Sequence, residues 1–263
     1  MALIRPMRKT ILVTGATSGF GKAIAERFAQ NGYTVCITGR RKERLDEMKA
    51  ELESKFDCKV ITLQFDIRNR QEVADAIEIL KTKTDRIDIL VNNAGLASGL
   101  GSIDNGDIDD WEVMIDTNIK GLLYVTRMVA PIMTQQASGH IFNIGSTAAK
   151  TVYKNGNVYC ATKFAVDALN QAMRIDLLNY GIKVTGIHPG MAETEFSLVR
   201  FKGDEDRAKG VYADINPLRA EDIADIVWYC ATLPAHVCIN DLTVTCLNQA
   251  TSYYTIKEAD RIK

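Results

Sequence analysis

Short runs rich in β-branched and apolar residues alternate with longer amphipathic stretches from one end of the chain to the other. The short runs, each expected to form a strand, are Thr10–Thr14, Thr34–Thr38, Lys59–Leu63, Asp88–Val91, His140–Asn143, Lys183–Ile187 and Leu242–Cys246. The stretches with helical periodicity are Gly21–Asn31, Lys42–Ser54, Gln71–Lys83, Trp111–Gln136, Val158–Asn179 and Ala220–Leu233. Repeated alternation of strand and helix is typical of a parallel sheet, because parallel neighbours need long crossover connections that cover both faces. The sequence therefore predicts an α/β fold with a doubly wound, seven-stranded parallel sheet.

No repeat, low-complexity tract or Pro/Gly-rich linker divides the chain, so we expect residues 1–263 to form one domain. One polar segment, residues 190–217, follows the penultimate predicted strand and is expected to be irregular. A segment of this length outside the regular elements is typical of a lid over a binding site. A solvated surface loop is the alternative interpretation.

The balance of charge argues against several classes of partner. Lys and Arg number 32 against 33 Asp and Glu, which leaves a net charge of −1 and no general attraction to nucleic acid or to an anionic membrane. No apolar stretch approaches the roughly 18 residues that a membrane span needs, and Ile11–Val13 is too short for the core of a signal peptide. We therefore expect a small-molecule ligand.

Six cysteines, at positions 36, 58, 160, 230, 238 and 246, are scattered without a CxxC pair. In a chain of this length they are expected to be buried thiols in a reducing compartment, which favours a cytoplasmic protein. The three histidines, at positions 140, 188 and 236, lack the spacing of metal ligands, so the sequence predicts no metal site.

The first predicted strand runs into the segment TGATSGFG, residues 14–21, and then directly into a helix. Glycines at this junction allow a tight turn and let backbone N–H groups approach a pyrophosphate at the positive end of the helix. This placement predicts a dinucleotide site of the Rossmann type rather than glycines that serve only a turn. The candidate cofactor-binding residues here are Gly15, Thr17, Ser18, Gly19, Phe20 and Gly21.

The second predicted strand ends at Gly39, Arg40 and Arg41, with no acid at that position. An NAD site places a carboxylate here for the ribose 2′-hydroxyl, whereas a guanidinium suits a 2′-phosphate, which it can bind through two parallel hydrogen bonds. The sequence therefore predicts NADP as the cofactor, with Arg40 and Arg41 close to its phosphate. The alternative is that both arginines begin a solvated helix.

Tyr159 and Lys163 are four residues apart in a stretch with helical period, which puts both side chains on one face of the helix. An ammonium close to a phenol favours the phenolate, so the pKa of Tyr159 is expected to fall from about 10 toward neutral pH. A tyrosine of this kind can act as the general acid or base for a carbonyl or an alcohol. Because the spacing alone is common on helix surfaces, its meaning depends on the neighbouring motifs.

Those neighbouring motifs occur in order: Asn92–Gly95 after the fourth predicted strand, Asn118, Ser146 after the fifth, and Pro189–Gly190 after the sixth. Together with the glycine turn and the Tyr159/Lys163 pair, they resemble the short-chain dehydrogenase/reductase family over essentially the whole chain. The resemblance implies that Ser146 polarises the substrate oxygen, Tyr159 exchanges the proton, and Lys163 holds the nicotinamide ribose while tuning Tyr159. It also implies that Asn118 holds a water that continues the proton relay.

Further segments are similar to one branch of that family, the NADP-dependent 3-hydroxy acid dehydrogenases. They are Asp116–Gly121, Ile144–Ala148, Gly156–Tyr159, Thr194–Ser197, Val199–Asp204 and Thr232–Val237. Members of the branch oxidise serine, L-allo-threonine and other short 3-hydroxy acids of the 3-hydroxypropionate type, and reduce the corresponding 3-oxo acids. The resemblance implies a transfer of hydride between NADP(H) and the C3 position of such an acid.

The same resemblance assigns further positions. It implies that Asp66 and Ile67 flank the adenine and that Asn93 lies at the adenosine ribose. Pro189, Gly190 and Thr194 would close over the nicotinamide amide. Such enzymes are usually tetramers, so a homotetramer is expected, paired through the two long helices predicted above.

A 3-hydroxy acid that presents its C3 oxygen to Ser146 and Tyr159 must present its carboxylate to a cation nearby. The segment that follows Pro189–Gly190 offers Arg200 and Lys202. Arg200 is favoured, because planar bidentate donors suit a carboxylate better than a point charge. The alternative is that both side chains are solvated.

Two other functions stay open from the sequence. One is a short-chain reductase of small aldehydes, ketones or diketones, and the other is a non-catalytic NADP-binding sensor. The complete set of Asn118, Ser146, Tyr159 and Lys163 favours catalysis, because a sensor has no reason to keep it.

Overall fold

One parallel sheet organises the computed structural model, which describes residues 8–262. Its seven strands lie in the order β3-β2-β1-β4-β5-β6-β7. Their bounds are β1 (Thr10–Val13), β2 (Thr34–Gly39), β3 (Lys59–Gln64), β4 (Ile89–Asn92), β5 (Gly139–Ile144), β6 (Ile182–Pro189) and β7 (Asp241–Val244). Each predicted strand overlaps one of these, so the predicted Rossmann-type sheet is confirmed.

The strand order reverses beside β1, which pairs with β2 on one side and with β4 on the other. In open parallel sheets a crevice forms at this reversal, outside the carboxyl ends of the strands, and ligands bind there. The topology therefore brings the ends of β1, β4 and β5 to one edge of the sheet.

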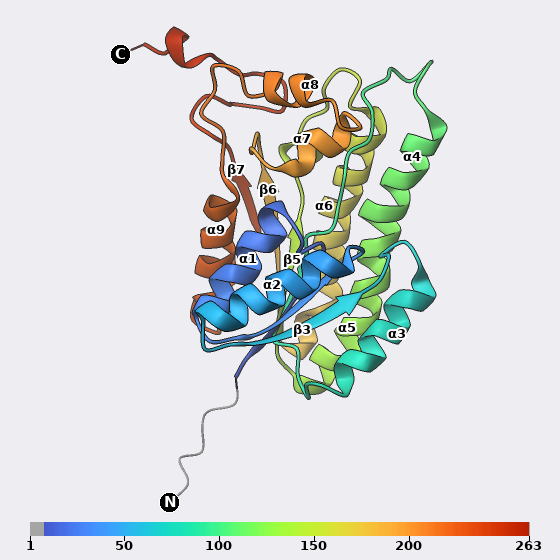
Figure 1. The fold of residues 1–263 in the computed structure, drawn as a ribbon, viewed down its shortest axis with the longest axis vertical. Helices are drawn as coiled ribbons and strands as arrows, with labels where there is room; N and C mark the ends of the chain where they lie inside the picture. The colour runs from blue at the N-terminus through green and yellow to red at the C-terminus, as the bar shows by residue number, and fades with distance from the viewer. Residues whose placement is uncertain (1–7, 263) are drawn as a thin grey trace, which may run out of the picture.

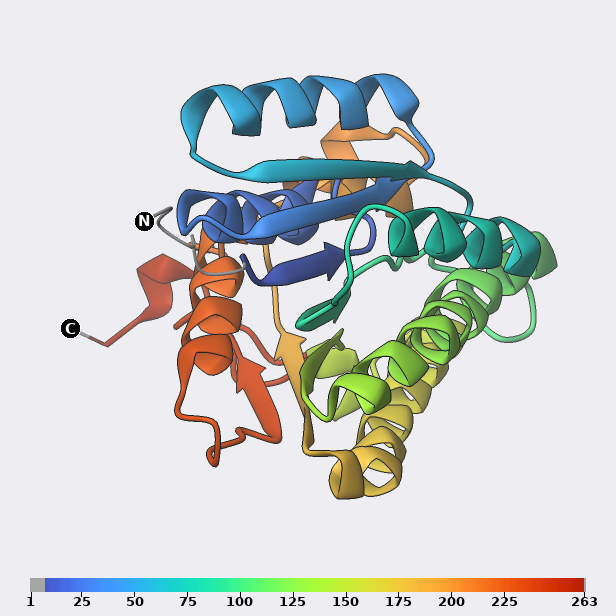
Figure 2. The same ribbon diagram turned by 90° about the horizontal axis from the view of Figure 1, so that it is seen from below.

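Helices cover both faces of the sheet (Figures 1 and 2). Helices α1 (Gly19–Gln30), α2 (Lys42–Lys55) and α9 (Ala220–Thr232) pack on one face, and α3 (Arg70–Lys81), α5 (Leu122–Gln136) and α6 (Asn157–Leu177) pack on the other. In β1, Ile11 and Val13 belong to the first apolar core and Leu12 to the second, and all three are fully buried. Successive strand residues point to opposite faces, which explains why the inner strands read as continuous apolar runs.

The remaining helical elements are short. They are α4 (Ile108–Ile115), α7 (Glu195–Arg200), α8 (Glu205–Gly210), the π-helix η1 (Asp116–Gly121), and the 3₁₀ turns η2 (Thr147–Ala149), η3 (Leu178–Tyr180) and η4 (Glu258–Asp260). The helix expected over Trp111–Gln136 thus starts earlier and is divided by η1. π-Turns inside α-helices are frequent at functional sites, and η1 carries Asn118.

The sequence suggested that residues 190–217 are irregular. This expectation is wrong in part, because the segment contains the helices α7 and α8. The Thr194 hydroxyl accepts a hydrogen bond from the Phe196 N–H (3.2 Å) and begins α7, and the Asp204 carboxylate accepts one from the Arg207 N–H (3.0 Å) and begins α8. Gly203, at φ +94°, lies between the two helices. Helices of six residues are too short for a helical period to be recognised in the sequence.

The six cysteines are all free. Cys58 and Cys238 are half-buried rather than buried, which corrects the expectation for those two. No helix within residues 8–262 is both long enough and apolar enough to cross a bilayer.

Candidate active site

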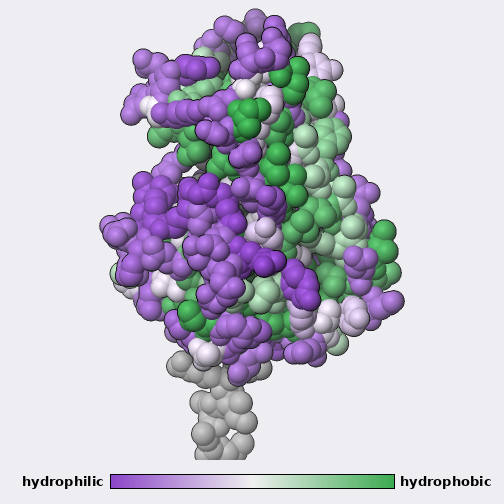
Figure 3. All heavy atoms as spheres, turned by 90° about the vertical axis from the view of Figure 1, so that its right-hand side faces the viewer, coloured by the Kyte–Doolittle hydropathy of each residue, from purple (hydrophilic) through white to green (hydrophobic). Residues whose placement is uncertain are grey.

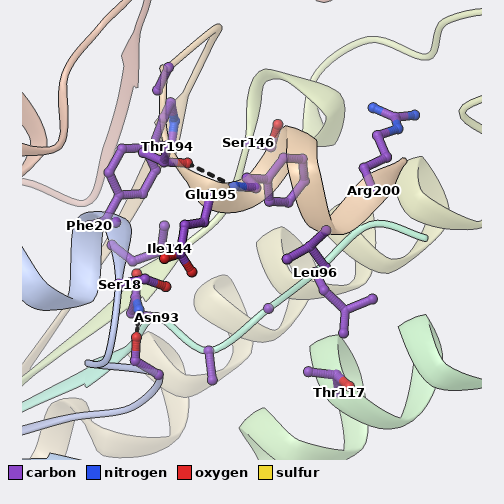
Figure 4. Close-up of a pocket in the computed structure, with 18 of the residues that line it drawn as sticks. Ser18, Phe20, Asn93, Leu96, Thr117, Ile144, Ser146, Thr194, Glu195 and Arg200 are labelled. Carbon is purple, nitrogen blue, oxygen red and sulfur yellow. Dashed lines mark hydrogen bonds between the residues drawn. The ribbon is translucent and has the colours of Figure 1, made fainter. Parts of the chain in front are cut away.

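A cavity of about 530 Å³ lies at the carboxyl ends of the strands. Figure 4 shows its extent, from Ser18 and Phe20 in the glycine turn to Arg200 at the far end of α7. The sequence-predicted residues that line it are Gly15, Thr17, Ser18, Gly19, Phe20, Arg40, Arg41, Asp66, Ile67, Asn93, Ser146, Tyr159, Lys163, Pro189, Gly190, Thr194 and Arg200. Gly21 and Asn118 lie behind this lining. The structure therefore brings nearly all of the predicted positions to one cavity.

The turn between β1 and α1 requires glycine for two separate reasons. Gly15 has a φ of +63°, and a Cβ atom on it would lie 2.9 Å from the Cα of Ala94. A Cβ on Gly21 would overlap the Gly15 carbonyl and the Asn93 amide. That amide donates hydrogen bonds to the carbonyls of Thr14 (2.8 Å) and Gly15 (3.1 Å), so it ties the end of β4 to the turn.

The two arginines after β2 differ in their contacts. Arg41 donates hydrogen bonds to Thr17 Oγ1 (2.8 Å) and, at 3.5 Å, to Ser18 Oγ in the glycine turn. It also pairs with Glu195 of α7 (3.4 Å), which accepts a second hydrogen bond from Arg44 (2.8 Å). Arg40 is exposed at the rim of the cavity. The arginines after β2 are thus joined directly to α7.

Asp66 and Ile67 line the cavity at the end of β3. The Asp66 carboxylate is bound by the Arg68 guanidinium, with its shortest contact at 2.6 Å. A hydrogen bond from Arg68 is the main reason that the pKa of Asp66 lies below its ordinary value. Ile67 is buried and abuts Gly121 of η1.

Ser146, Tyr159 and Lys163 meet where β5 ends beside α6. Tyr159 and Lys163 are buried, with exposed fractions of 8% and 6%, and the Ser146 side chain is near enough to the Tyr159 hydroxyl to act on its pKa. Lys163 Nζ donates a hydrogen bond to the Ile144 carbonyl (3.0 Å) and lies 5.9 Å from the centroid of the Tyr159 ring. A serine, a phenol and an ammonium therefore converge on one wall of the cavity.

The expected lowering of the Tyr159 pKa is wrong for this arrangement. Burial raises the pKa of Tyr159 well above 10, and the Ser146 hydrogen bond and the Arg200 charge oppose this without cancelling it. Lys163 points at the Ile144 carbonyl instead of the phenol, and burial lowers its own pKa to about 8. Burial disfavours the charged form of both groups, which raises the pKa of a phenol and lowers that of an ammonium.

Asn118 is buried in η1, and its side-chain amide is fully engaged. Its Oδ1 accepts a hydrogen bond from the Leu96 N–H (2.8 Å), and its Nδ2 donates to the Leu96 carbonyl (2.8 Å) and to Thr162 Oγ1 (3.0 Å). A Cβ on Gly95 would lie 3.2 Å from Asn118 Oδ1 and 3.5 Å from Lys163 Nζ. The Asn118 side chain thus joins the extension of β4 to the helix that carries Tyr159 and Lys163.

The segment after β6 covers the cavity from above. A Cβ on Gly190 would overlap the Gln249 side chain, whose oxygen accepts a hydrogen bond from the Met191 N–H (2.7 Å). Thr194 lies against Gly19, since a Cβ there would be 3.4 Å from the threonine Cβ. The segment that follows β6 therefore contacts the glycine turn directly.

Arg200, at the end of α7, reaches the cavity beside the tyrosine. Its guanidinium carbon lies 5.6 Å from the ring centroid of Tyr159 and 5.4 Å from that of Tyr153, and its Nε donates to the Gly99 carbonyl at 3.4 Å. Lys202 does not line the cavity. Its ammonium pairs with Asp110 (3.0 Å) and Asp107 (3.5 Å).

Several lining residues were not anticipated from the sequence. They are Tyr153, Glu195, Phe196, Tyr212 and Gln249. Phe196 lies 5.7 Å from Tyr159 between ring centroids, and the Tyr212 hydroxyl is 2.7 Å from Ser197 Oγ. Glu195 and Phe196 lie in the segment Thr194–Ser197, whose family resemblance was a usable hint, and Tyr153 lies between Ser146 and Tyr159. Tyr212 and Gln249 give no sequence signal of their own.

A separate cluster lies outside the cavity lining and was not predicted either. Asp167 of α6, His188 of β6 and Asp241 of β7 each offer one side-chain atom, and these atoms lie within 4.8 Å of one another. Burial is the main cause that lowers the pKa of His188, and the charges of Asp241 and Asp167 oppose it.

Comparison with known proteins extends these observations. The family model described as short chain dehydrogenase matches residues 9–204. The chain is 48% identical over 241 residues to the NADP-dependent 3-hydroxy acid dehydrogenase YdfG of Salmonella typhi, covering 91% of this chain and 96% of that protein. It is 44% identical over 251 residues to sulfoacetaldehyde reductase 2 of Chromohalobacter salexigens, covering 95% and 99% respectively. A solved structure of the closed form of serine dehydrogenase complexed with NADP+ matches with a TM-score of 0.88 at 46% identity, covering 95% of this chain and 99% of that chain.

Proposed function

The chain belongs to the short-chain dehydrogenase family, and we propose that it is an NADP-dependent oxidoreductase that acts on the C3 hydroxyl or carbonyl of a short 3-hydroxy acid. The observation that carries the proposal is the buried Tyr159, which lines one cavity together with Ser146, with Lys163 one helical turn away and with the glycine turn. The 48% identity to an NADP-dependent 3-hydroxy acid dehydrogenase supports the substrate class.

The lining of the cavity suits a dinucleotide. The glycine turn brings the N-terminus of α1 to the cavity, where backbone N–H groups favour a phosphate, and Arg40 and Arg41 place two cations in the lining. In this proposal Arg40 and Arg41 hold the 2′-phosphate, Asp66 and Ile67 flank the adenine, and Asn93 lies at the adenosine ribose. The segment from Pro189 to Thr194 covers the nicotinamide amide. When bound, NADP(H) supplies or accepts the hydride.

The chain's own residues handle the proton. In the reducing direction, Ser146 donates a hydrogen bond to the carbonyl oxygen and Tyr159 delivers its proton to that oxygen as the hydroxyl forms. The raised pKa of Tyr159 keeps the phenol protonated, as a general acid requires. Lys163 holds the nicotinamide ribose and stabilises the phenolate once the proton has left. Asn118 holds a water in the relay that returns a proton to Tyr159.

Arg200 is the cation proposed for the substrate carboxylate. It lies beside the Tyr159 ring at the end of the cavity opposite the glycine turn, as Figure 4 shows. A carboxylate two carbons from the reacting oxygen can therefore reach a planar, bidentate donor. Lys202 is a poorer candidate, because its ammonium is already paired with Asp107 and Asp110 outside the cavity lining.

A second candidate is the reduction of a short aldehyde that carries an acidic group. The 44% identity to a sulfoacetaldehyde reductase favours it over the ketone and diketone alternatives. Arg200 would serve an anionic group in this substrate as well, so the two candidates share one site and differ only in the acid group.

A substrate panel tests the proposal. Short 3-hydroxy acids and simple alcohols are offered with NADP+ or NAD+, aldehydes and 3-oxo acids with NADPH or NADH, and absorbance of the reduced nucleotide is followed. We expect the highest kcat/KM with NADP+ and a 3-hydroxy acid. Equal rates with the acids and with neutral alcohols of the same size would refute the substrate class, and preference for NAD+ would refute the cofactor.

We extend the proposal to the organisation of the chain: one NADP-binding domain over residues 1–263, a substrate lid at 190–217, and a homotetramer that works in the cytoplasm.

Figure 3 shows hydrophobic side chains gathered along the face formed by α4 and α5. Exposed apolar residues on these helices and on α6 include Ile108, Leu123, Phe164 and Ile175. A tetramer paired through the long helices would cover them. Light scattering of the purified full-length chain measures the mass, and a monomer would contradict this part.

A further inference from the structure

Three elements converge on the cluster of Asp167, His188 and Asp241, away from the cavity. Asp167 lies on α6 one turn beyond Lys163, His188 directly precedes Pro189 on β6, and Asp241 begins the edge strand β7. None of the three lines the cavity. The function proposed above makes no use of them.

His188 is the unusual member of this cluster. Its side chain is 1% exposed, and neither ring nitrogen forms a hydrogen bond. On the Nδ1 side, a Cβ on Gly145 would overlap the ring. Nε2 faces the two carboxylates, 2.9 Å from Asp241 Oδ2 and 3.5 Å from Asp167 Oδ1, but forms no hydrogen bond with either. A buried polar nitrogen without a hydrogen-bond partner is costly and calls for an explanation.

The two carboxylates of the cluster share one cation. Lys150 Nζ lies 2.9 Å from Asp241 Oδ2 and 3.2 Å from Asp167 Oδ1, so one ammonium faces two carboxylates. The Lys150 side chain is 32% exposed and has a flexible stem, so it can turn into solvent. A divalent cation in its place would neutralise both carboxylates and give the imidazole nitrogen a lone-pair acceptor.

We propose that Asp167, His188 and Asp241 bind a divalent first-row transition metal ion, with Zn²⁺ as the probe, in place of the Lys150 ammonium. One imidazole and two carboxylates form a donor set that suits zinc and its neighbours, whereas Mg²⁺ and Ca²⁺ take oxygen ligands. The ion would join α6, which carries Tyr159 and Lys163, to β6 and β7. Its role is to stabilise this arrangement, and it takes no part in the reaction.

The test uses the full-length protein freed of metal by a chelator. Zn²⁺ is added in calorimetry and in thermal unfolding, with Mg²⁺ as the comparison ion. We expect one site per chain for zinc, no comparable binding of magnesium, and a Tm raised by roughly 5 °C at a zinc concentration about a hundred times the Kd.

Three variants locate the site. Asp241→Asn, on the exposed edge strand, and His188→Gln, in the core, should each weaken zinc binding by at least about tenfold, because even residues that only orient a ligand are worth that much. Lys150→Met should strengthen it, because the competing ammonium is gone. All variants keep the six cysteines, so zinc bound by thiols would appear unchanged in every one of them.

Asp107→Asn is the matched control. Asp107 and Asp110 are also bridged by a lysine, Lys202, but no histidine joins them in the described structure. This variant should bind zinc as the wild type does. The proposal is overturned if zinc fails to bind, if Asp241→Asn and His188→Gln bind it unchanged, or if Lys150→Met does not bind it more tightly.

Discussion

The guanidinium of Arg41 lies 2.8 Å from the hydroxyl of Thr17, so the end of β2 is tied to the glycine turn. The same arginine contacts Glu195 of the lid segment at 3.4 Å. Its neighbour Arg40 is exposed at the rim of the cavity. Arg41 is therefore partly committed to structure, and Arg40 is the arginine free to meet a 2′-phosphate.

Replacing Arg40 by Asp tests the choice of cofactor. The change removes the partner of the 2′-phosphate and offers the 2′-hydroxyl of NAD an acceptor. Hydrogen bonds to charged groups contribute about 1.5–3 kcal/mol each, so the ratio of kcat/KM for NADP to that for NAD should fall by at least about tenfold. Arg44→Asp makes the same change of charge at a residue that pairs with Glu195 and does not line the cavity. An unchanged ratio in Arg40→Asp would show that Arg40 does not discriminate.

Tyr159→Phe tests the proton transfer. The variant keeps the ring and deletes the proton donor, so kcat should fall by about 10²–10⁴ while the Kd for NADP stays close to that of the wild type. Lys163→Met should lower kcat and also weaken NADP binding, because that side chain would contact the nucleotide and the phenolate. Tyr180→Phe, at an exposed position in η3, is the control for the loss of a phenol. Near-normal turnover by Tyr159→Phe would exclude the mechanism.

Arg200→Ala tests the recognition of the substrate carboxylate. The variant should lose roughly 2–5 kcal/mol of transition-state binding for the acid and much less for its methyl ester, which carries no charge. Lys202→Ala should treat both substrates as the wild type does, because Lys202 does not line the cavity. The measurement is kcat/KM for the acid and the ester in each variant. Equal losses for both substrates would mean that Arg200 shapes the lid without binding the carboxylate.

Stability should depend on pH through Lys163. Burial lowers its pKa from 10.5 to about 8 in the folded chain, so the folded state carries an unfavourable buried ammonium below pH 8. Between about pH 8 and 10 the unfolded chain binds more protons at this residue, and the contribution of Lys163 to stability therefore rises with pH. Lys163→Met removes the effect. Its free energy of unfolding minus that of the wild type should decrease by up to about 3 kcal/mol over this interval in denaturant titrations. A difference independent of pH would contradict the lowered pKa.

Gly15→Ala tests the need for the glycine turn. The new Cβ would lie 2.9 Å from Ala94 Cα at a φ of +63°, so both a steric overlap and a left-handed conformation are forced on it. The left-handed conformation alone costs roughly 1–2 kcal/mol, and the turn must shift. We expect lower stability and weaker NADP binding, measured by thermal unfolding and by calorimetry. Gly210→Ala, whose Cβ would meet no atom within 4 Å, should change neither. Equal effects of the two variants would show that the turn tolerates a side chain.

Local patterns of the sequence determined the framework of this protein. The alternation of β-branched and amphipathic segments predicted all seven strands. The inner strands are apolar because they are buried on both faces, and the edge strands β3 and β7 were recognised although they are partly exposed. The glycine turn was predicted because it follows a strand and opens a helix, and the Tyr159/Lys163 pair because it shares one helix face. The role of Ser146 came from the family resemblance. These positions converge once the strands align in parallel, and the cavity lining shows that they do.

The tertiary structure decided the features that depend on contacts between residues distant in sequence or on burial away from water. Helices α7 and α8 are too short to show a period, and they form because Thr194 and Asp204 satisfy their first N–H groups. The pKa of Tyr159 rises instead of falling, because burial of the phenol outweighs a lysine that faces the Ile144 carbonyl. Asp167, His188 and Asp241 show no ligand spacing along the chain. They meet because α6 lies over β6 and β6 pairs with β7, and only the packed sheet supplies those neighbours.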